Sequence, residues 1–127
     1  MSLQVVLDTD GEFLLAVVRG TVAFDATWRV LKQICDTALQ KHLTQILVDA
    51  LAAQGVVRTI DRYNLGVKLV TYCGKHKLWP RLAFVGQPPV ADGFGVLVAK
   101  NRGLDIESFP NRKEALEWVR AAPKSVV

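Results

Sequence analysis

The feature that most constrains the fold is an alternation of short apolar runs with longer segments whose apolar residues recur every three or four positions. The run QILVDA, residues 45–50, is continuous and rich in branched side chains, which is typical of a central strand covered on both faces. RLAFVG, residues 81–86, has the same character. Strands that alternate with helices predict right-handed crossovers and a mostly parallel sheet. The helical spacing occurs at Phe24, Trp28, Leu31, Cys35 and Ala38, and again at Ile60, Tyr63, Val67 and Val70.

The remaining segments complete the order of elements. Two strands, Leu3–Asp8 and Glu12–Arg19, flank the hairpin signal Asp10-Gly11. QPPVADGFGVLVAKNRG predicts a proline-led helix that ends at Gly103, and DIESF predicts the last strand. We therefore expect a single α/β domain over residues 1–127. It has the order ββαβαβαβα, a mixed, mostly parallel sheet of about five strands, about four helices, and a loose C-terminal end at 120–127.

Composition narrows the class of protein. Apolar residues make up 50% of the chain and charged residues 22%, which indicates a globular protein rather than a disordered one. The apolar runs are too short to span a bilayer, and the N-terminus shows no signal-peptide pattern. The two cysteines, Cys35 and Cys73, lie in apolar helical segments, so we expect reduced core thiols in a cytoplasmic protein.

Positive charge is concentrated in residues 58–81. Six basic residues stand there against the single acid Asp61, so the segment carries +5 and the rest of the chain −1. A basic face favours an acidic partner or a membrane surface, although a solvated helix face has the same composition. No nucleic-acid motif is present, so nucleic acid is not an expected partner. The basic residues are Arg58, Arg62, Lys68, Lys75, Lys77 and Arg81.

The sequence offers little support for catalysis or for a bound cofactor. Serine occurs only at Ser2, Ser108 and Ser125, two of them near the termini. Cys73 and His76 share a helix face, but no second pair supplies the further ligands that a zinc site needs. The glycines of DGFG lack the lysine of a phosphate loop. We therefore expect no enzymatic activity, no cofactor and no metal.

The junction between the third strand and the second helix holds the candidate binding residues. Thr59 is expected to be the N-cap of this helix, and Arg58 and Arg62 flank it. Free N–H groups at a helix start, with two arginines, could hold a phosphate or carboxylate. Asp49 is expected at the carboxyl end of its strand, where open α/β sheets bind ligands.

Several segments together carry a resemblance to a known family. RGTVAFD, ILVDA, FVGQPP, VAKNRGLDIESF and EALEWV occur in the expected order along nearly the whole chain. With them, the sequence resembles the STAS domain of bacterial anti-sigma-factor antagonists and sulphate-transporter tails. More closely, it resembles the SpoIIAA-like (STAS/SEC14) family of small bacterial proteins. The resemblance implies a protein-interaction module rather than an enzyme.

The resemblance also implies where a phosphorylation switch would lie. In the antagonists, a Ser or Thr after an Asp at the start of the second helix is phosphorylated by a partner kinase. Matching TIDRYNLG to that pattern places Asp61 on the acid and Gly66 on the last glycine. The acceptor position is then Arg62, which has no hydroxyl, and Asn64 replaces a glycine. The family switch is therefore expected to be absent, and Thr59 is the remaining candidate for phosphorylation.

Two functional hypotheses follow. The first is a regulatory or scaffolding module that binds another protein through the second helix, chiefly with Thr59, Arg62, Tyr63 and Lys68. The second is a carrier or sensor for a small anionic or lipid-like ligand, prompted by the SEC14 part of the family name. A homodimer is compatible with either. A ligand site would be a cleft lined by Asp49, Arg58, Arg62 and Tyr63.

Overall fold

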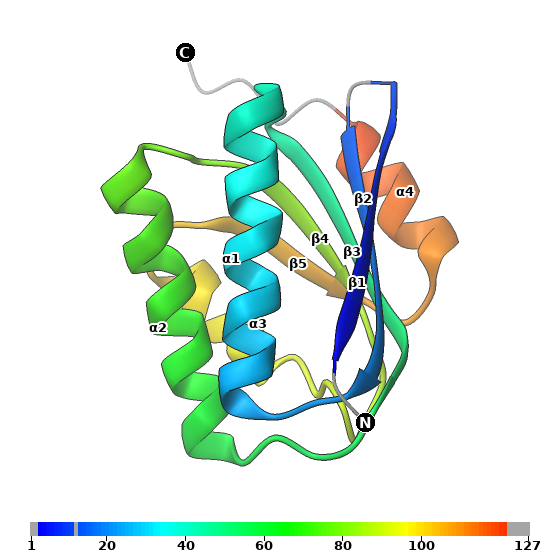
Figure 1. The fold of residues 1–127 in the computed structure, drawn as a ribbon, viewed down its shortest axis with the longest axis vertical. Coiled ribbons are helices and arrows are strands. Elements are labelled where there is room, and N and C mark those ends of the chain that lie inside the picture. Colours follow the sequence, from blue (N-terminus) through cyan, green and yellow to red (C-terminus); the bar gives the residue numbers. More distant parts are fainter. Residues whose placement is uncertain (1–2, 12, 122–127) are drawn as a thin grey trace.

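A computed structural model describes residues 3–11 and 13–121 and contains one five-stranded mixed sheet (Figure 1). The strands lie in sequence order across the sheet, from β1 to β5. β1 pairs with β2 in antiparallel fashion, and the other three pairings are parallel. The predicted fold class and order of elements are confirmed. The strands are β1 (Gln4–Asp10), β2 (Phe13–Thr21), β3 (Gln45–Gln54), β4 (Arg81–Val85) and β5 (Asp105–Phe109).

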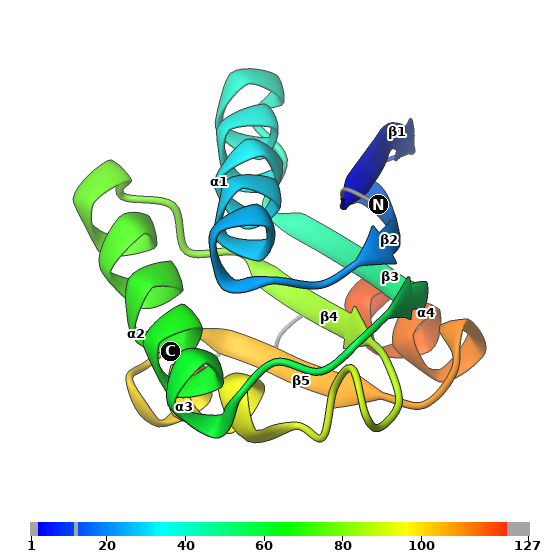
Figure 2. The ribbon, with the colours of Figure 1, turned by 60° about the horizontal axis from the view of Figure 1, so that its bottom comes forward.

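The helices cover both faces of the sheet unequally. The first three connect neighbouring parallel strands, and successive right-handed crossovers in one direction place their helices on the same face. The fourth follows the last strand and packs on the opposite face (Figures 1 and 2). The helices are α1 (Phe24–Lys41), α2 (Thr59–His76), α3 (Phe94–Asn101) and α4 (Arg112–Arg120).

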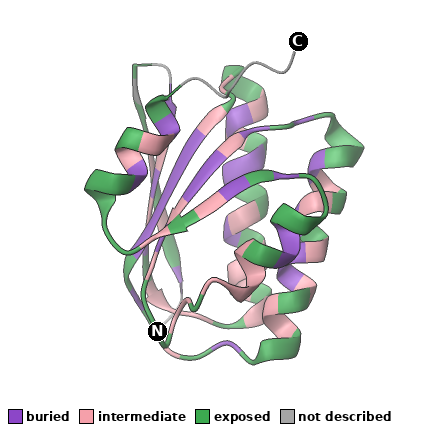
Figure 3. Ribbon diagram, turned by 180° about the vertical axis from the view of Figure 1, so that it is seen from behind, coloured by how far each residue is buried: buried purple, intermediate pink, exposed green. Residues whose placement is uncertain are grey.

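The sheet separates two apolar cores. Val48 of β3 packs on the side of α1 and α2, whereas its neighbour Leu47 packs on the side of α4 with Ala115 and Val119. Both faces of the central strands are therefore buried, as the continuous apolar run at 45–50 indicated. Figure 3 shows these strands as mostly buried.

Several predicted boundaries differ from the structure. In the hairpin, β1 ends at Asp10 rather than Asp8, and β2 ends at Thr21 rather than Arg19. Glu12 lies outside the described residues. β3 continues to Gln54, because its pairing with β2 extends to Thr21. The third helix begins only at Phe94, after Gly93 adopts a left-handed conformation, and not at the prolines. Of the predicted loose end at 120–127, residue 120 closes α4, and 122–127 lie outside the described residues.

α4 begins as its sequence predicts. The side chain of Asn111 accepts a hydrogen bond of 2.9 Å from the backbone N–H of Glu114. The Asn111 amide in turn donates to the Glu114 carboxylate at 2.8 Å. This reciprocal arrangement is the capping box that the spacing indicated, and it fixes where α4 starts on the sheet.

Both cysteines lie in the larger core as free, buried thiols, one on α1 and one on α2. A hydrogen bond with Cys73 and burial raise the pKa of the Cys35 thiol above its usual range. Cys35, held protonated, is a poor nucleophile, whereas the same hydrogen bond lowers the pKa of Cys73. Both buried side chains pack between the two helices.

Candidate functional site

The start of α2 differs in one respect from the prediction. Arg58 occupies the N-cap position, and Thr59 is the first helical residue, exposed to solvent. The Arg58 guanidinium donates to the Asp61 carboxylate at 3.0 Å, and this bond and charge raise the pKa of Arg58. The Asp61 carboxylate pairs with Arg58, whose side chain stays 77% exposed. It also places negative charge in the first helical turn, where the dipole favours it.

α2 carries apolar residues on two different faces. The buried face consists of Leu65, Gly66, Leu69 and Cys73. The predicted stripe that begins with Ile60 and Tyr63 is instead turned outward in the first half of the helix. Ile60 is 56% exposed and Tyr63 38% exposed, and Val56 in the preceding loop is 67% exposed. These three residues form what we call the α2 patch: Val56, Ile60 and Tyr63.

A close helix crossing sets the rotation of α2. A Cβ atom at Gly66 would lie 2.7 Å from the carbonyl oxygen of Gly95 in α3, so only glycine fits there. A Cβ atom at Gly95 would lie 3.2 Å from the carbonyl oxygen of Arg62. Because the glycine side of α2 must face α3, Ile60 and Tyr63 are turned toward solvent.

Tyr63 is supported by Arg102, the residue that follows α3. Its hydroxyl accepts a hydrogen bond of 2.9 Å from the Arg102 guanidinium, whose carbon lies 5.2 Å from the centre of the tyrosine ring. The exposed ring is thereby held in one orientation, which lowers the entropy lost when a partner packs on it.

Arg62 points inward rather than toward a partner. Its guanidinium donates to the Asp92 carboxylate and to the Pro89 carbonyl, each at 2.7 Å. The Arg62 side chain is only 14% exposed. The arginine thus ties α2 to the loop between β4 and α3, and it is not available as a surface cation.

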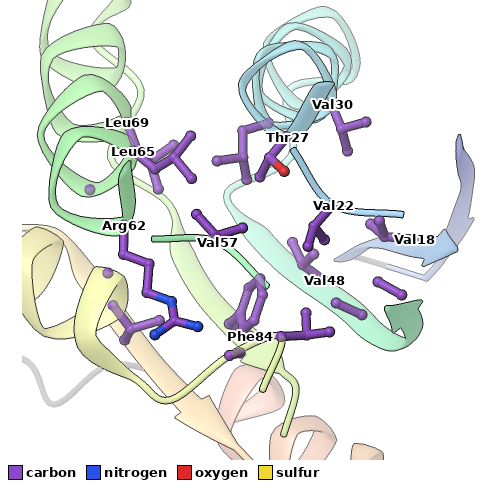
Figure 4. Close-up of a pocket in the computed structure, with 18 of the residues that line it drawn as sticks. Val18, Val22, Thr27, Val30, Val48, Val57, Arg62, Leu65, Leu69 and Phe84 are labelled. Atoms are coloured by element: carbon purple, nitrogen blue, oxygen red, sulfur yellow. The ribbon is translucent and has the colours of Figure 1, made fainter. Parts of the chain in front are cut away.

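A partly enclosed cavity of about 130 Å³ lies between α1, α2, the loop before α3 and the sheet. Its walls are almost entirely aliphatic. Figure 4 shows Arg62 and Thr27 reaching toward it from opposite sides, one from α2 and one from α1. Its other lining residues include Val22, Val48, Val57, Leu65, Leu69 and Phe84.

Asp49 does not join this group of residues. It lies within β3 rather than at its end, and it is only 7% exposed. One of its carboxylate oxygens accepts two hydrogen bonds from Arg112 of α4, at 2.6 and 2.9 Å. The other accepts from the Leu51 backbone N–H at 3.0 Å. Asp49 therefore anchors α4 on the opposite face of the sheet.

The basic residues of segment 58–81 do not share one surface. Arg81 stacks on Trp118 of α4, 3.6 Å from the ring centre, and pairs with Asp105 at 3.2 Å. Lys68 lies over Trp28 of α1, 5.3 Å from its ring. Nine helical residues at about 1.5 Å each place Lys68 about 14 Å along the axis from Thr59.

The candidate site residues thus do not form one site. Asp49 faces α4, Arg62 points inward and Lys68 lies over Trp28. Arg58, Thr59 and Tyr63 lie at the exposed start of α2.

Aromatic side chains of α1 and α2 form a cluster that the sequence did not suggest. Tyr72 contacts Trp28 edge to face at 5.7 Å and His76 at 4.3 Å. Its hydroxyl donates a hydrogen bond to the Asp36 carboxylate. This hydrogen bond, with the negative charge and some desolvation, raises the pKa of Tyr72 to about 12.

We therefore expect the stability of the folded protein to depend on alkaline pH through Tyr72. Because its pKa is raised on folding, its contribution to stability is fully present below about pH 10 and is lost as the pH rises to about 12. We expect the ultraviolet tyrosinate signal of the folded protein to show one tyrosine ionising near pH 12. Asp36→Asn should lower that pKa, and Asp8→Asn, remote in sequence, should not. An unchanged titration in Asp36→Asn would contradict this assignment.

The sequence analysis did not identify two polar residues that line the cavity, Asp92 and Thr27. Asp92 has a local signal, because an acid two residues before a helix can accept its first N–H groups, and it accepts from the Phe94 N–H at 3.0 Å. Thr27 has no such signal, since its place opposite Arg62 follows from helix packing.

Within the described ranges, no helix is long and apolar enough to cross a membrane. Nor do those ranges bring together three or more His, Cys, Asp or Glu side chains that could hold a metal ion.

Comparison with known proteins gives a match in structure but not in sequence. No protein-family model matches the sequence, and no curated protein is significantly similar to it. An anti-sigma factor antagonist from Mycobacterium paratuberculosis superposes with a TM-score of 0.64 at 16% identity, over 94% of this chain and 96% of that one. An uncharacterised protein with a SpoIIAA-like fold from Shewanella loihica superposes with a TM-score of 0.57 at 15% identity, over 93% and 94%.

The fold is SpoIIAA-like. Both superpositions cover more than nine-tenths of each chain. The expected SpoIIAA-like architecture is thereby confirmed. At these identities the likeness establishes the fold alone.

Proposed function

We propose that this SpoIIAA-like protein is a non-enzymatic regulatory module that binds another protein through the α2 patch. The observation that carries the proposal is the outward position of three large apolar residues: Val56 in the loop before α2, and Ile60 and Tyr63 in the first half of the helix. Large apolar side chains grouped in this way are typical of a contact surface. The structural likeness to an anti-sigma factor antagonist supports the same class of function.

The charged residues around the patch complete the proposed surface. Arg58 borders it with a side chain that is 77% exposed, and Thr59 is exposed beside it. We expect a partner with an apolar contact region and an acidic rim, since charge around an apolar centre orients the encounter. Lys68 lies about 14 Å further along α2, over Trp28, and is not part of this border. Arg62 contributes by holding α2 to the loop before α3.

Affinity capture with a matched pair of variants tests the proposal. The native protein, Ile60→Glu and Val6→Glu are each used as bait in a lysate of the source organism. Ile60 and Val6 are 56% and 58% exposed, so both variants place the same charge at an equally accessible aliphatic position. A carboxylate buried in an apolar contact without a partner is strongly unfavourable. We therefore expect a protein that the native chain and Val6→Glu capture, and that Ile60→Glu does not.

The outcome also separates the other possibilities. Equal recovery with all three baits, or a loss only with Val6→Glu, would exclude the α2 patch as the contact surface. Recovery of a second copy of this chain would replace the proposal with a homodimer. The intact mass of the bait tests Thr59 as a phosphoacceptor, because one added phosphate that Thr59→Val removes would assign it there.

A further inference from the structure

We propose that the cavity beneath α2 binds a small neutral organic molecule with an apolar body and one oxygen acceptor, whose oxygen accepts a hydrogen bond from Nε of Arg62. This site is separate from the α2 patch, because none of the three patch residues lines the cavity. It also differs from the anionic site that the sequence suggested at the helix start.

The position of the cavity suits a ligand. It lies beside three connections that follow β2, β3 and β4: the start of α1, the loop before α2 and the loop before α3. The carboxyl ends of parallel strands are the usual location of ligand sites in open α/β sheets. Aliphatic walls favour an apolar body, and a cavity of about 130 Å³ is close to the size of an engineered apolar cavity of about 150 Å³ that binds benzene.

Two unpartnered polar atoms distinguish this cavity from a simple packing void. Among the residues that the structure describes, the buried side-chain atoms without a hydrogen-bond partner are Nε of Arg62 and Oγ1 of Thr27. Both residues line this cavity, from opposite walls (Figure 4). A buried N–H group left unpaired is costly, so a bound oxygen acceptor at Arg62 gains free energy that an apolar molecule does not.

The charges around Arg62 favour a neutral ligand over an anion. The Asp92 carboxylate already pairs with the guanidinium at 2.7 Å, and the Pro89 carbonyl accepts from its other terminal nitrogen. An anion at Nε would lie near the Asp92 carboxylate and within aliphatic walls, where burial of a charge is unfavourable. A ketone, alcohol or phenol oxygen supplies the acceptor without that cost.

Phenol and toluene provide a direct test, because they have nearly the same shape. Phenol carries a hydroxyl group where toluene carries a methyl group. Methyl-labelled valine and leucine side chains of the full chain are followed by NMR during titration with each compound. We expect saturable shifts at lining methyls such as those of Val22, Val57 and Leu65. Phenol should bind about tenfold more tightly than toluene, as a hydrogen bond from a charged donor implies.

Two variants locate the polar contact. Arg62→Lys removes Nε but keeps a cation for Asp92, and it should reduce the affinity for phenol to about that for toluene. Thr27→Val replaces the other unpartnered hydroxyl, on the opposite wall, with a methyl group at constant shape, so the preference for phenol should remain. Thr37→Val is the control: it makes the same change on α1 at a hydroxyl that donates to the Gln33 carbonyl, outside the cavity.

Three results would overturn the proposal. If neither compound produced saturable shifts up to its solubility limit, the cavity would hold water or remain empty. If toluene bound as tightly as phenol, the ligand class would be wrong. If Arg62→Lys folded and kept the preference for phenol, Arg62 would not be the donor. Should Arg62→Lys fail to fold, the ¹⁵N resonance of the Arg62 Nε–H group in the native protein still decides, because phenol should shift it and toluene should not.

Discussion

Gly66→Ala is expected to destabilise the protein by about 2 kcal/mol, because a methyl group at this position has no space. The added Cβ would lie 2.7 Å from the backbone oxygen of Gly95 and 2.9 Å from a methyl group of Val98. The nearest obstacle is backbone, so α2 and α3 must move apart to relieve the contact. That cost exceeds the gain of up to about 1 kcal/mol that alanine brings to a helix interior.

Gly74→Ala is the matched control for this prediction. It makes the same change in the same helix, but its Cβ would meet only the Trp79 ring, at 3.7 Å. Here the helix propensity dominates, and we expect a gain of about 0.5 kcal/mol. Urea unfolding of both variants measures the two free energies. Equal effects in the two variants would show that the crossing of α2 and α3 is not tightly packed.

Arg112→Met is expected to destabilise the protein by about 2 kcal/mol, because it leaves the Asp49 carboxylate buried without its cation. The Asp49 side chain is 9% exposed, whereas that of Arg112 is 44% exposed. Water can reach part of the site, so the cost is below that of a fully buried pair. Thermal or urea unfolding at neutral pH measures the loss.

The neighbouring Lys113→Met provides the control, because it removes one positive charge from an exposed side chain of the same helix turn. Its effect should stay below about 0.5 kcal/mol. Adding Asp49→Asn to Arg112→Met should recover part of the loss, since a neutral amide tolerates burial better than an unpaired carboxylate. A double variant no more stable than Arg112→Met alone would contradict the ion-pair explanation.

The order of elements was predictable from the sequence because the signals are local. Continuous apolar runs, the Asp10-Gly11 turn and the spacing of Asn111 and Glu114 each describe a few neighbouring residues. The sequential strand order then places the first three helices on one face. Less local features, such as the extension of β3 to Gln54, depend on pairing with β2.

The site was less predictable because it depends on the rotation of α2. The spacing of Ile60 and Tyr63 is as helical as that of Leu65 and Leu69, and periodicity alone does not choose the buried face. The close approach of Gly66 to α3 makes that choice. The partners of Arg62 and Asp49, which are 30 and 63 positions away in sequence, likewise follow only from the fold.

One geometric cause therefore connects the two proposed sites. The same crossing that turns Ile60 outward brings Arg62 over the cavity, with Gly66 and Gly95 in its wall. A substitution that separates α2 from α3 is expected to disturb both the α2 patch and the cavity. Variants confined to either site, such as Ile60→Glu or Thr27→Val, are needed to examine the sites separately.

Site-specific photo-crosslinking in living cells tests the central claim most directly. A benzophenone amino acid is placed at position 60 in one strain and, as the control, at position 6 in another, since these two sites have similar exposure. Interaction through the α2 patch predicts a covalent adduct with a different protein from position 60 and none from position 6. An adduct from position 6 alone, an adduct only with a second copy of this chain, or no adduct from position 60 would contradict it.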